Sequence, residues 1–395
     1  MKTRVMDNGA PAEAKMSPDF LFTSCQGTIS ATDLGQPITT PACEWPLLAQ
    51  QITLALDAAR AAGQSNPLLI GAFAFDPAEA SCLYVPGRYE RSEKLAPTEP
   101  TPATEVEQTA EANRVISVQS TPPASEFQAS VSAALDAFGQ GKLAKVVLSR
   151  KLTLTLHRPA DPTQVMARLM AQNPHAFHFS LPLGQGRRLL GASPELLLRV
   201  SGGEVFTHPL AGSARRASEP AQDEMVARDL LASRKDQHEH KLVIDEIRRV
   251  LTPHCRELAI PAHPSLMSTD TLWHLGTPIA GRLNGGEASV LSLACQLHPT
   301  PALCGYPTEL ARQFIREQEP FRRALFSGIV GWCDSQGNGE WAVVIRCGVL
   351  DGHQVELFAG AGIVAGSDPA MEWAETGTKL GTMLKALGLD LEVAQ

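Results

Sequence analysis

The chain has 395 residues, of which 44% are hydrophobic and 19% charged, and it carries a formal net charge of −8. This length and hydrophobic content fit one large domain or two ordinary ones. The acidic balance, without any basic run, argues against a nucleic-acid-binding surface.

Membrane and extracellular classes are disfavoured as well. No stretch approaches the roughly 18 apolar residues of a membrane span, and the N-terminus lacks an apolar signal segment. Eight cysteines are scattered without a CxxC pair, which predicts reduced thiols and neither zinc nor disulfides. We therefore expect a soluble, cytoplasmic protein without a membrane partner.

The N-terminal elements carry little chemistry. Apolar runs predict strands at residues 20–25, 68–75 and 82–86, and helical periodicity predicts a helix at residues 46–62.

A stretch rich in proline, threonine and glutamate at residues 92–115 predicts a mobile linker. We expect residues 1–115, which include this linker, to form an N-terminal part of the fold. Residues 116–390 would form the main domain.

A predicted strand at residues 145–156 begins with Lys145. The apolar side chains alternate onto one face, and Lys145 lies on the other face with Val147 and Ser149. Lys145 is either an ordinary lysine at a strand end or a functional amine at the strand's mouth.

Glu195 stands between a Ser-Pro turn and a run of three leucines. Partial burial in this setting would raise the pKa of its carboxyl group and make it a candidate general acid. The alternative is an exposed glutamate in a turn.

One long helix is predicted for residues 223–251. Its apolar stripe runs through Leu242, and Glu239 and Glu246 fall on or beside that stripe. A carboxylate that faces the core needs a metal, an arginine or a substrate donor as its partner. Both glutamates could equally be charges at the edge of the stripe.

Two polar residues interrupt apolar strands. His274 lies within the strand-like residues 266–282 and is either a satisfied core histidine or part of a site. Arg346 lies in the middle of a strand predicted for residues 340–350. A buried guanidinium demands a carboxylate or phosphate partner, so structural pairing and substrate binding are both open.

The C-terminal stretch has the strongest pattern. Gly360 and Gly362 predict a glycine-rich turn whose exposed amides could bind an anion, and a Ser-Asp-Pro run predicts a helix start. Within that helix Glu372, Glu375 and Lys379 lie on one face. The two carboxylates suit a hard cation such as Mg²⁺, and the lysine suits a substrate anion. The alternative is a solvated face with an ion pair.

From Lys145 onward the chain resembles the chorismate-utilising enzyme family, and most of all the isochorismate synthases of the enterobactin type, which serve catechol siderophore biosynthesis. The resemblance rests on five runs in a fixed order: Lys145-Val-Val-Leu-Ser-Arg, Gly191-Ala-Ser-Pro-Glu-Leu-Leu, Pro209-Leu-Ala-Gly-Ser-Ala-Arg-Arg, Lys235-Asp-Gln-His-Glu-His and His298-Pro-Thr-Pro-Ala-Leu-Cys-Gly. The run Ile315-Arg-Glu-Gln-Glu-Pro-Phe-Arg-Arg and the C-terminal stretch complete the set. The N-terminal part is similar only in length and layout.

The resemblance also narrows the reaction. Relatives that add ammonia usually have glutamine where this chain has Lys145, and relatives with a covalent lysine have that lysine where this chain has Ala211. The resemblance therefore implies water as the nucleophile and isochorismate as the product. Salicylate synthases share Lys145 and Glu195 and remain an alternative, as does a non-catalytic protein that binds Mg²⁺ and chorismate for regulation.

In this family the implied roles are as follows. Lys145 takes a proton from water that attacks C2 of chorismate, and Glu195 gives a proton to the hydroxyl that leaves C4. Mg²⁺ is held by Glu239 and Glu375, with Glu372 reaching it directly or through water. One departure is Leu242, where some relatives carry another acidic residue, and it leaves the metal shell open. The remaining implied substrate-binding residues are Gly212, Ser213, His274, Ala302, Leu303, Phe326, Arg346, Gly360 and Lys379.

The implied fold is the α+β chorismate-binding fold of anthranilate synthase component I, with two α/β subdomains whose sheets pack centrally around the site. Residues 116–390 would be the catalytic domain. We expect the small molecule chorismate as the partner, no glutamine amidotransferase subunit, and a monomer.

Overall fold

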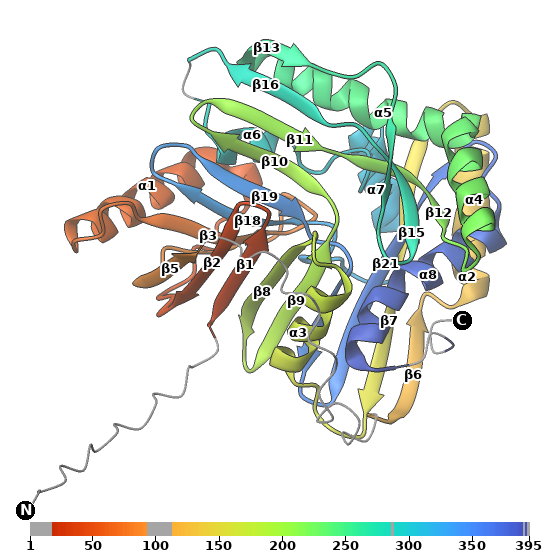
Figure 1. The fold of residues 1–395 in the computed structure, drawn as a ribbon, viewed down its shortest axis with the longest axis horizontal. Coiled ribbons are helices and arrows are strands. Elements are labelled where there is room, and N and C mark those ends of the chain that lie inside the picture. Colours follow the sequence, from red (N-terminus) through yellow and green to blue (C-terminus); the bar gives the residue numbers. More distant parts are fainter. Residues whose placement is uncertain (1–17, 93–112, 286–287, 390–391, 393–395) are drawn as a thin grey trace, which may run out of the picture.

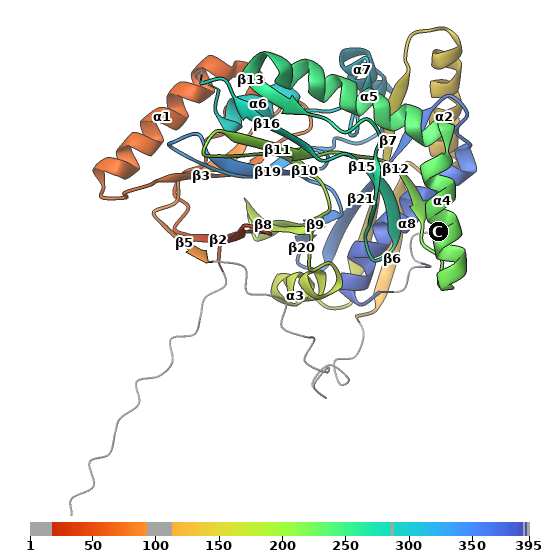
Figure 2. The ribbon, with the colours of Figure 1, turned by 45° about the horizontal axis from the view of Figure 1, so that its top comes forward.

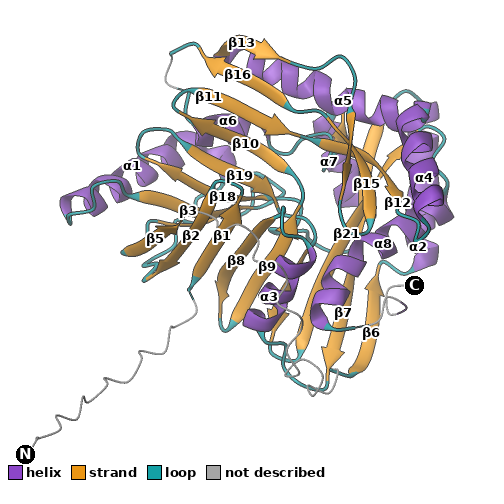
Figure 3. Cartoon of the chain, in the orientation of Figure 1, coloured by secondary structure: helices purple, strands orange, loops and turns teal. Residues whose placement is uncertain are grey.

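The computed structural model describes residues 18–92, 113–285, 288–389 and 392. Two large sheets lie one above the other, and helices cover their outer faces (Figure 1). In Figure 2 the helices α1 (Trp45–Ala61), α5 (Arg234–Leu251) and α6 (Val290–Leu297) lie above the upper sheet, and α3 (Pro162–Gln172) lies below the lower one. The expected α+β class is confirmed, and strands and helices alternate without a regular rhythm along the chain (Figure 3).

The lower sheet contains ten strands, and every pairing among them is antiparallel. Its order is β17 (Gly305–Tyr306), β7 (Lys145–Leu156), β21 (Gln354–Val364), β20 (Cys347–Asp351), β9 (Arg187–Ser193), β8 (Phe177–Gly184), β1 (Phe20–Ser24), β2 (Gly27–Thr32) and β5 (Arg88–Ser92), and β6 (Val115–Thr121) also pairs with β7. The N-terminal strands β1, β2 and β5 thus form one edge of a sheet whose other strands all come later in the chain.

The upper sheet has eight strands. Its order is β13 (Cys255–Ala259), β16 (Ile279–Leu283), β11 (Glu204–His208), β10 (Leu196–Ser201), β19 (Gly339–Val343), β18 (Ile329–Asp334), β3 (Leu68–Phe73) and β4 (Cys82–Tyr84). The strands expected at residues 20–25, 68–75 and 82–86 are present as β1, β3 and β4.

A small third sheet bends away from the upper one. It contains β12 (Leu210–Arg215), β15 (Leu272–Gly276) and β14 (Ser265–Ser268). The paired strands β11 and β16 continue as β12 and β15 beyond Pro209 and Pro278. Proline cannot donate to a strand ladder, so two prolines at the same level end one sheet and let the ribbon turn. The bend directs β12 and β15 towards β21 and α8 (Pro369–Leu387).

The alternation of strand β3 explains the layers. Leu68, Ile70 and Ala72 belong to the apolar cluster between the two sheets, whereas Leu69 and Phe73 pack outward in the cluster that contains residues of α1. Because both faces of the strand are covered, it reads as a continuous apolar run in the sequence.

The remaining helices cover the edges and the lower face. Helices α3 and α8 share a cluster with β7, β9 and β21, and α2 (Ala124–Gly139) and α7 (Thr308–Gln318) share another with the start of β7. Helix α4 (Pro220–Ala232) packs on the small third sheet. No helix of the described segments is long and apolar enough to cross a membrane.

The prediction of a single helix at residues 223–251 is wrong. The chain forms α4 and α5, separated by Ser233, whose backbone is extended with φ −65° and ψ 115°. The Ser233 hydroxyl accepts a hydrogen bond from the amide of Asp236 and so caps α5. Neither glycine nor proline stands at this break, and the polar residues 233–241 that follow Ala232 carry no apolar residue to show where a new helix starts.

The prediction of one strand at residues 340–350 is also wrong. Strand β19 ends at Val343 in the upper sheet, and β20 begins at Cys347 in the lower sheet. Arg346 lies in the crossover with φ +50°, a left-handed conformation that non-glycine residues adopt uncommonly. Both strands are buried, so the apolar pattern does not mark the change of sheet.

Gly360 and Gly362 do not form the predicted turn. Both lie within β21, which runs on to Val364 and pairs with β7 along its whole length. A Cβ atom on Gly362 would lie 2.1 Å from Oε1 of Glu239, and one on Gly360 would lie 2.6 Å from Oγ of Ser149. The glycines therefore lie in a continuous strand and allow close approach of other side chains.

The linker predicted at residues 92–115 falls almost entirely on residues 93–112, which lie outside the described residues. The division of the fold near residue 115 stays a prediction.

Candidate active site

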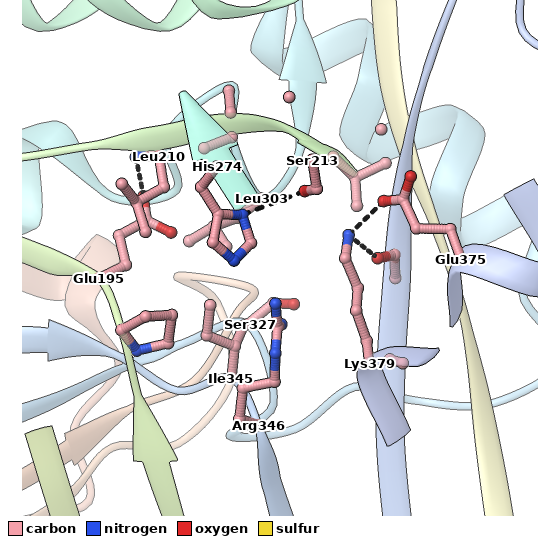
Figure 4. Close-up of a pocket in the computed structure, with 18 of the residues that line it drawn as sticks. Glu195, Leu210, Ser213, His274, Leu303, Ser327, Ile345, Arg346, Glu375 and Lys379 are labelled. Carbon is pink, nitrogen blue, oxygen red and sulfur yellow. Dashed lines mark hydrogen bonds and ion pairs between the residues drawn. The ribbon is translucent and has the colours of Figure 1, made fainter. Parts of the chain in front are cut away.

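A cavity of about 680 Å³ opens where the two large sheets connect. Its walls come from the β9–β10 turn, the β19–β20 crossover, the ribbon β12–β15, the loop after α6, and strands β7 and β21 with helices α5 and α8. Figure 4 shows Glu195, His274, Arg346 and Lys379 pointing into it from different elements. Polar and charged groups that converge on one cavity from several elements are typical of a small-molecule site.

Glu195 lies at the turn between β9 and β10 and is 4% exposed. Its amide donates to Oγ of Ser193, and its Oε1 accepts a long hydrogen bond of 3.5 Å from the amide of Leu210. Burial raises the pKa of Glu195 from 4.5 to about 7, although the Leu210 hydrogen bond and the Lys145, Arg346 and Lys379 cations oppose the shift. The alternative of an exposed turn glutamate is excluded, and near neutral pH this carboxyl group can hold or release a proton.

Lys145 begins β7 and is fully buried. Its Nζ lies 2.9 Å from Oε1 of Glu239, which projects from α5. Since Gly362 has no side chain, the Glu239 carboxylate can lie over β21 and reach this lysine. Lys145 therefore lies behind the cavity wall, whereas Glu239 lines the cavity itself.

Three carboxylates gather at this end of the cavity, from helices α5 and α8. Each of them is matched by a lysine: Glu239 by Lys145, Glu372 by Lys235 at 2.8 Å, and Glu375 by Lys379 at 2.5 Å. Glu246, the other glutamate of the α5 stripe, instead pairs with Arg249 on the helix surface.

The pKa of Glu372 is raised by burial and by the nearby Glu375 carboxylate. Within the described segments no group of three His, Cys, Asp or Glu side chains is placed to hold a metal ion as it stands.

Asp236 is an acidic residue of this region that sequence patterns missed. It lies one helical turn before Glu239 on α5. It packs against Gly212, since a Cβ atom added to that glycine would lie 3.0 Å from the Asp236 Cβ. Burial raises its pKa, and the Glu239 and Glu375 carboxylates contribute to the rise. The spacing of three residues from Glu239 could have indicated it.

Two cationic side chains line the cavity together with the carboxylates. The Arg346 guanidinium projects from the crossover, and Lys379 projects from α8 and donates to the carbonyl oxygen of Gly360 at 2.8 Å. Burial lowers the pKa of Arg346 to about 10, so this group remains cationic at neutral pH. Arg346 and Lys379 lie at the same cavity, which suits a ligand with more than one anionic group.

His274 projects from β15 next to Ser213 of β12, with 3.2 Å between Nδ1 and Oγ (Figure 4). Burial, with Arg346 and Lys379 nearby, lowers the pKa of His274 well below its usual value. The imidazole is therefore neutral. Its Nε2 is buried and has no hydrogen-bond partner among the described residues, so it can serve a ligand.

The apolar wall comes from the loop after α6 and from the crossover region. Ala302 and Leu303 lie in that loop, and the Phe326 ring stacks on Phe358 with centroids 5.1 Å apart. The sequence analysis singled out Ala211 through the family resemblance, but it assigned no role to the other apolar lining residues, which are Val147, Pro194, Leu210, Ile345, Phe358 and Ala359. Ordinary strand residues carry no local signal of this kind.

The structure thus brings together residues that are far apart in the sequence. Twelve of the fourteen residues selected above line the cavity: Glu195, Gly212, Ser213, Glu239, His274, Ala302, Leu303, Phe326, Arg346, Gly360, Glu375 and Lys379. Lys145 and Glu372 do not line it, and each is held behind the wall by an ion pair. Chemically, the cavity combines a protonatable carboxyl group at Glu195, the cations Arg346 and Lys379, and the carboxylates Glu239 and Glu375.

Known proteins resemble this chain over nearly its whole length. The family model described as "Chorismate binding enzyme" matches residues 88–388. A protein of Aeromonas hydrophila, provisionally named an isochorismate synthase, is 84% identical over 396 residues that cover 100% of both chains. Isochorismate synthase EntC of Escherichia coli strain K12 is 48% identical over 334 residues, which cover 84% of each chain. The crystal structure of DhbC from Bacillus anthracis, 36% identical, superposes with a TM-score of 0.87 over 96% of this chain and 98% of that one.

Proposed function

The chain belongs to the chorismate-binding enzymes, in the branch of the isochorismate synthases, and we propose that its cavity converts chorismate reversibly into isochorismate with the help of Mg²⁺. Water adds at C2, the ring double bonds shift, and the hydroxyl at C4 leaves. One water enters and one leaves, so the reaction is an isomerisation.

The observation that carries the proposal is the buried Glu195. A general acid that operates near neutral pH needs a pKa close to that pH, and burial brings this carboxyl group to about 7. In our proposal, protonated Glu195 gives its proton to the C4 hydroxyl as the C–O bond breaks. A carboxyl group with an ordinary pKa would be ionised and could not donate.

Lys145 is the proposed base. Its ammonium group is buried and is held by Glu239 at 2.9 Å. Once deprotonated, the amine would accept a proton from the water that attacks C2. In the reverse direction each group has the opposite role, since Glu195 as a carboxylate accepts a proton and Lys145 as an ammonium donates one.

The substrate would be held through its two carboxylates and its ring. Arg346, Lys379 and the backbone around Gly360 would bind the enolpyruvyl carboxylate. Neutral His274, oriented by Ser213, can make a hydrogen bond without adding charge. Gly212 and Ser213 would line the pocket, and Ala302, Leu303 and Phe326 would shape it and limit elimination of pyruvate.

The carboxylate cluster fits Mg²⁺, which prefers oxygen ligands. Glu372 lies close enough to Glu375 to have its pKa raised by that carboxylate, and such crowding of negative charge favours a bound cation. Glu239 and Glu375 would hold the ion, with Glu372 contributing directly or through water. When bound, Mg²⁺ would anchor the ring carboxylate and withdraw charge from the ring.

The direct test is incubation of the purified protein with chorismate, with and without Mg²⁺, followed by chromatography. We expect isochorismate in reversible balance with chorismate only when Mg²⁺ is present. Lys145→Ala should lower turnover by about 10² or more. The control is Lys151→Ala on the same strand, which removes a partly exposed lysine paired with Glu356 and should behave like the wild type.

Other products would redirect the proposal. Salicylate and pyruvate as the main products would favour a salicylate synthase with the same site. Chorismate binding without turnover would favour a regulatory protein.

We further propose that the isochorismate serves a catechol siderophore pathway of the enterobactin type in the cytoplasm, and that the protein acts as a monomer without an amidotransferase subunit. The resemblance of the sequence to isochorismate synthases of the enterobactin type supports the pathway. Expression in a bacterium that lacks its siderophore-specific isochorismate synthase should restore siderophore production, and failure despite active enzyme would point to another pathway.

A further inference from the structure

A buried ion pair lies directly behind the apolar wall of the cavity. Glu319 follows the last residue of α7, and Arg323 lies in the loop that leads to Phe326. Their side chains are 3% and 2% exposed. The Arg323 Nε donates to Oε2 of Glu319 at 2.8 Å and Nη2 donates to Oε1, so the pair is bidentate.

The same two side chains bind the main chain of two wall segments. Arg323 Nη1 donates to the carbonyl oxygen of Leu303 at 2.9 Å, and Nη2 donates to that of Val147 at 2.7 Å. Glu319 Oε1 accepts from the amide of Ser149 at 2.8 Å. The pair therefore joins β7 to the loop after α6.

A third wall segment is fixed by ring contacts. The Arg323 guanidinium lies 4.4 Å from the ring centroid of Phe75 and 5.9 Å from that of Phe326. The amide of Phe326 also donates to the carbonyl oxygen of Arg323. Three cavity-lining residues, Val147, Leu303 and Phe326, are thus held by one charged pair.

Strand β7 links this pair to the proposed base. Lys145 begins the strand, two residues before Val147 and four before Ser149. Two hydrogen bonds from the pair fix the strand at Val147 and Ser149, close to the point where Lys145 projects. A shift of β7 would therefore move the Lys145 amine relative to the ring.

A purely stabilising role explains these contacts less well. A buried ion pair often contributes no more stability than apolar side chains of the same volume. What such apolar side chains could not supply is the set of hydrogen bonds to the main chain on either side of the wall.

We propose that Glu319 and Arg323 are positioning residues that set both the turnover of isochorismate formation and the partition of the product towards pyruvate elimination. This inference rests on the proposed function. In the elimination the bond between C3 and the enolpyruvyl oxygen of isochorismate breaks, and the hydrogen on C2 passes to the enolpyruvyl methylene. Salicylate and pyruvate result. A loosened Leu303 and Phe326 would give the enolpyruvyl group the freedom that this step needs.

The test compares three variants with the wild type. Glu319→Leu/Arg323→Met removes both charges at similar volume, so it keeps a filled core while losing the wall hydrogen bonds. Arg323→Lys keeps the charge but loses the planar fork. Arg322→Met is the matched control, because this neighbouring side chain is 89% exposed. Thermal midpoint, kcat, KM for chorismate, and the ratio of pyruvate to isochorismate are measured for each.

We expect both pair variants to lose about tenfold or more in kcat, since small misplacement of catalytic groups costs this much or more. KM should stay within about threefold, because Arg346 and Lys379 lie on other elements, and the pyruvate fraction should rise. The control should match the wild type in all four measurements. Wild-type kcat and product ratio in a folded double variant would overturn the positioning role, whatever its thermal midpoint.

Different results would overturn the proposed function and the positioning role of Glu319 and Arg323. A wild-type protein that forms no isochorismate overturns the proposed function, and the positioning role falls with it. A wild-type protein that forms isochorismate, beside pair variants that do so equally well, overturns the positioning role alone.

Discussion

Glu195 shows how one residue acquires its chemistry from its surroundings. Three leucines after it and a proline before it place the carboxyl group in a buried turn, and this much could be predicted from the local sequence. The nearness of Lys145, Arg346 and Lys379 could not be predicted, because those residues come from three other segments. Local composition predicts burial, whereas the charges that face a buried group depend on the fold.

The raised pKa of Glu195 also has a consequence for stability. Below a pH of about 4.5 the carboxyl group is protonated in both folded and unfolded chains, so it does not change the free energy of unfolding. As the pH rises from about 4.5 to about 7, the carboxyl group ionises in the unfolded chain but stays protonated in the folded one. Above about 7 the folded state is disfavoured by up to about 3 kcal/mol.

We therefore predict that Glu195→Gln raises the thermal midpoint relative to the wild type at about pH 8 and leaves it nearly unchanged at about pH 4.5. Unfolding scans at both pH values measure the difference. Glu204→Gln, at an exposed position of β11, is the control and should show no such dependence. An equal change at both pH values would mean that burial does not raise the pKa.

Asp236 and Val147 mark the limit of prediction at this scale. Asp236 has a spacing signal from Glu239 that could be read, because both lie on one helix face. Val147 has none, since a valine in a strand is ordinary until the fold shows which face borders the cavity.

Among the elements, β21 and β12 contribute the most lining residues, and glycine in β21 permits the arrangement around Lys145. Gly362 leaves space above the sheet for Glu239, and Glu239 reaches Lys145 through that space. The strand itself could be predicted from its apolar residues. Its continuation through two glycines could not, because glycine alone indicates a turn as readily as a close approach.

Gly362→Ala tests this arrangement. The added methyl group would lie 2.1 Å from Oε1 of Glu239, so the carboxylate must move. We predict that the Mg²⁺ concentration needed for half-maximal protection against thermal unfolding rises about tenfold or more, and that isochorismate formation falls with it. Gly139→Ala, with open space around its added Cβ, is the control. An unchanged Mg²⁺ requirement would argue against Glu239 as a ligand.

The two elements that the sequence did not divide lack the residues that usually mark a break. The break at Ser233 and the crossover at residues 344–346 carry no glycine or proline, and at the crossover apolar residues continue on both sides. Apolar periodicity reports burial, and burial continues where the chain changes direction inside the core. The bend at Pro209 and Pro278, by contrast, carries its own signal, since proline ends a strand ladder.

At the scale of the whole molecule, the cavity lies where the chain passes between the two sheets, at the β9–β10 turn and at the β19–β20 crossover. Strand β19 of the upper sheet continues as β20 of the lower sheet, and Arg346 lies between them. The ribbon β12–β15 closes the cavity on one side, and α5 and α8 bring the carboxylates from another. Register and layer order assemble this arrangement, and neither can be read from one sequence without a resemblance to a known family.

The central claim is that water adds at C2 within this cavity, with Lys145 and Glu195 as base and acid. The most direct measurement is a short incubation with chorismate and Mg²⁺ in ¹⁸O-water, followed by mass spectrometry of the isochorismate. We predict one solvent oxygen in the product, at C2, and no labelled isochorismate from Lys145→Ala. Unlabelled isochorismate from the wild-type protein would mean that the hydroxyl migrates within the substrate, and would contradict the account.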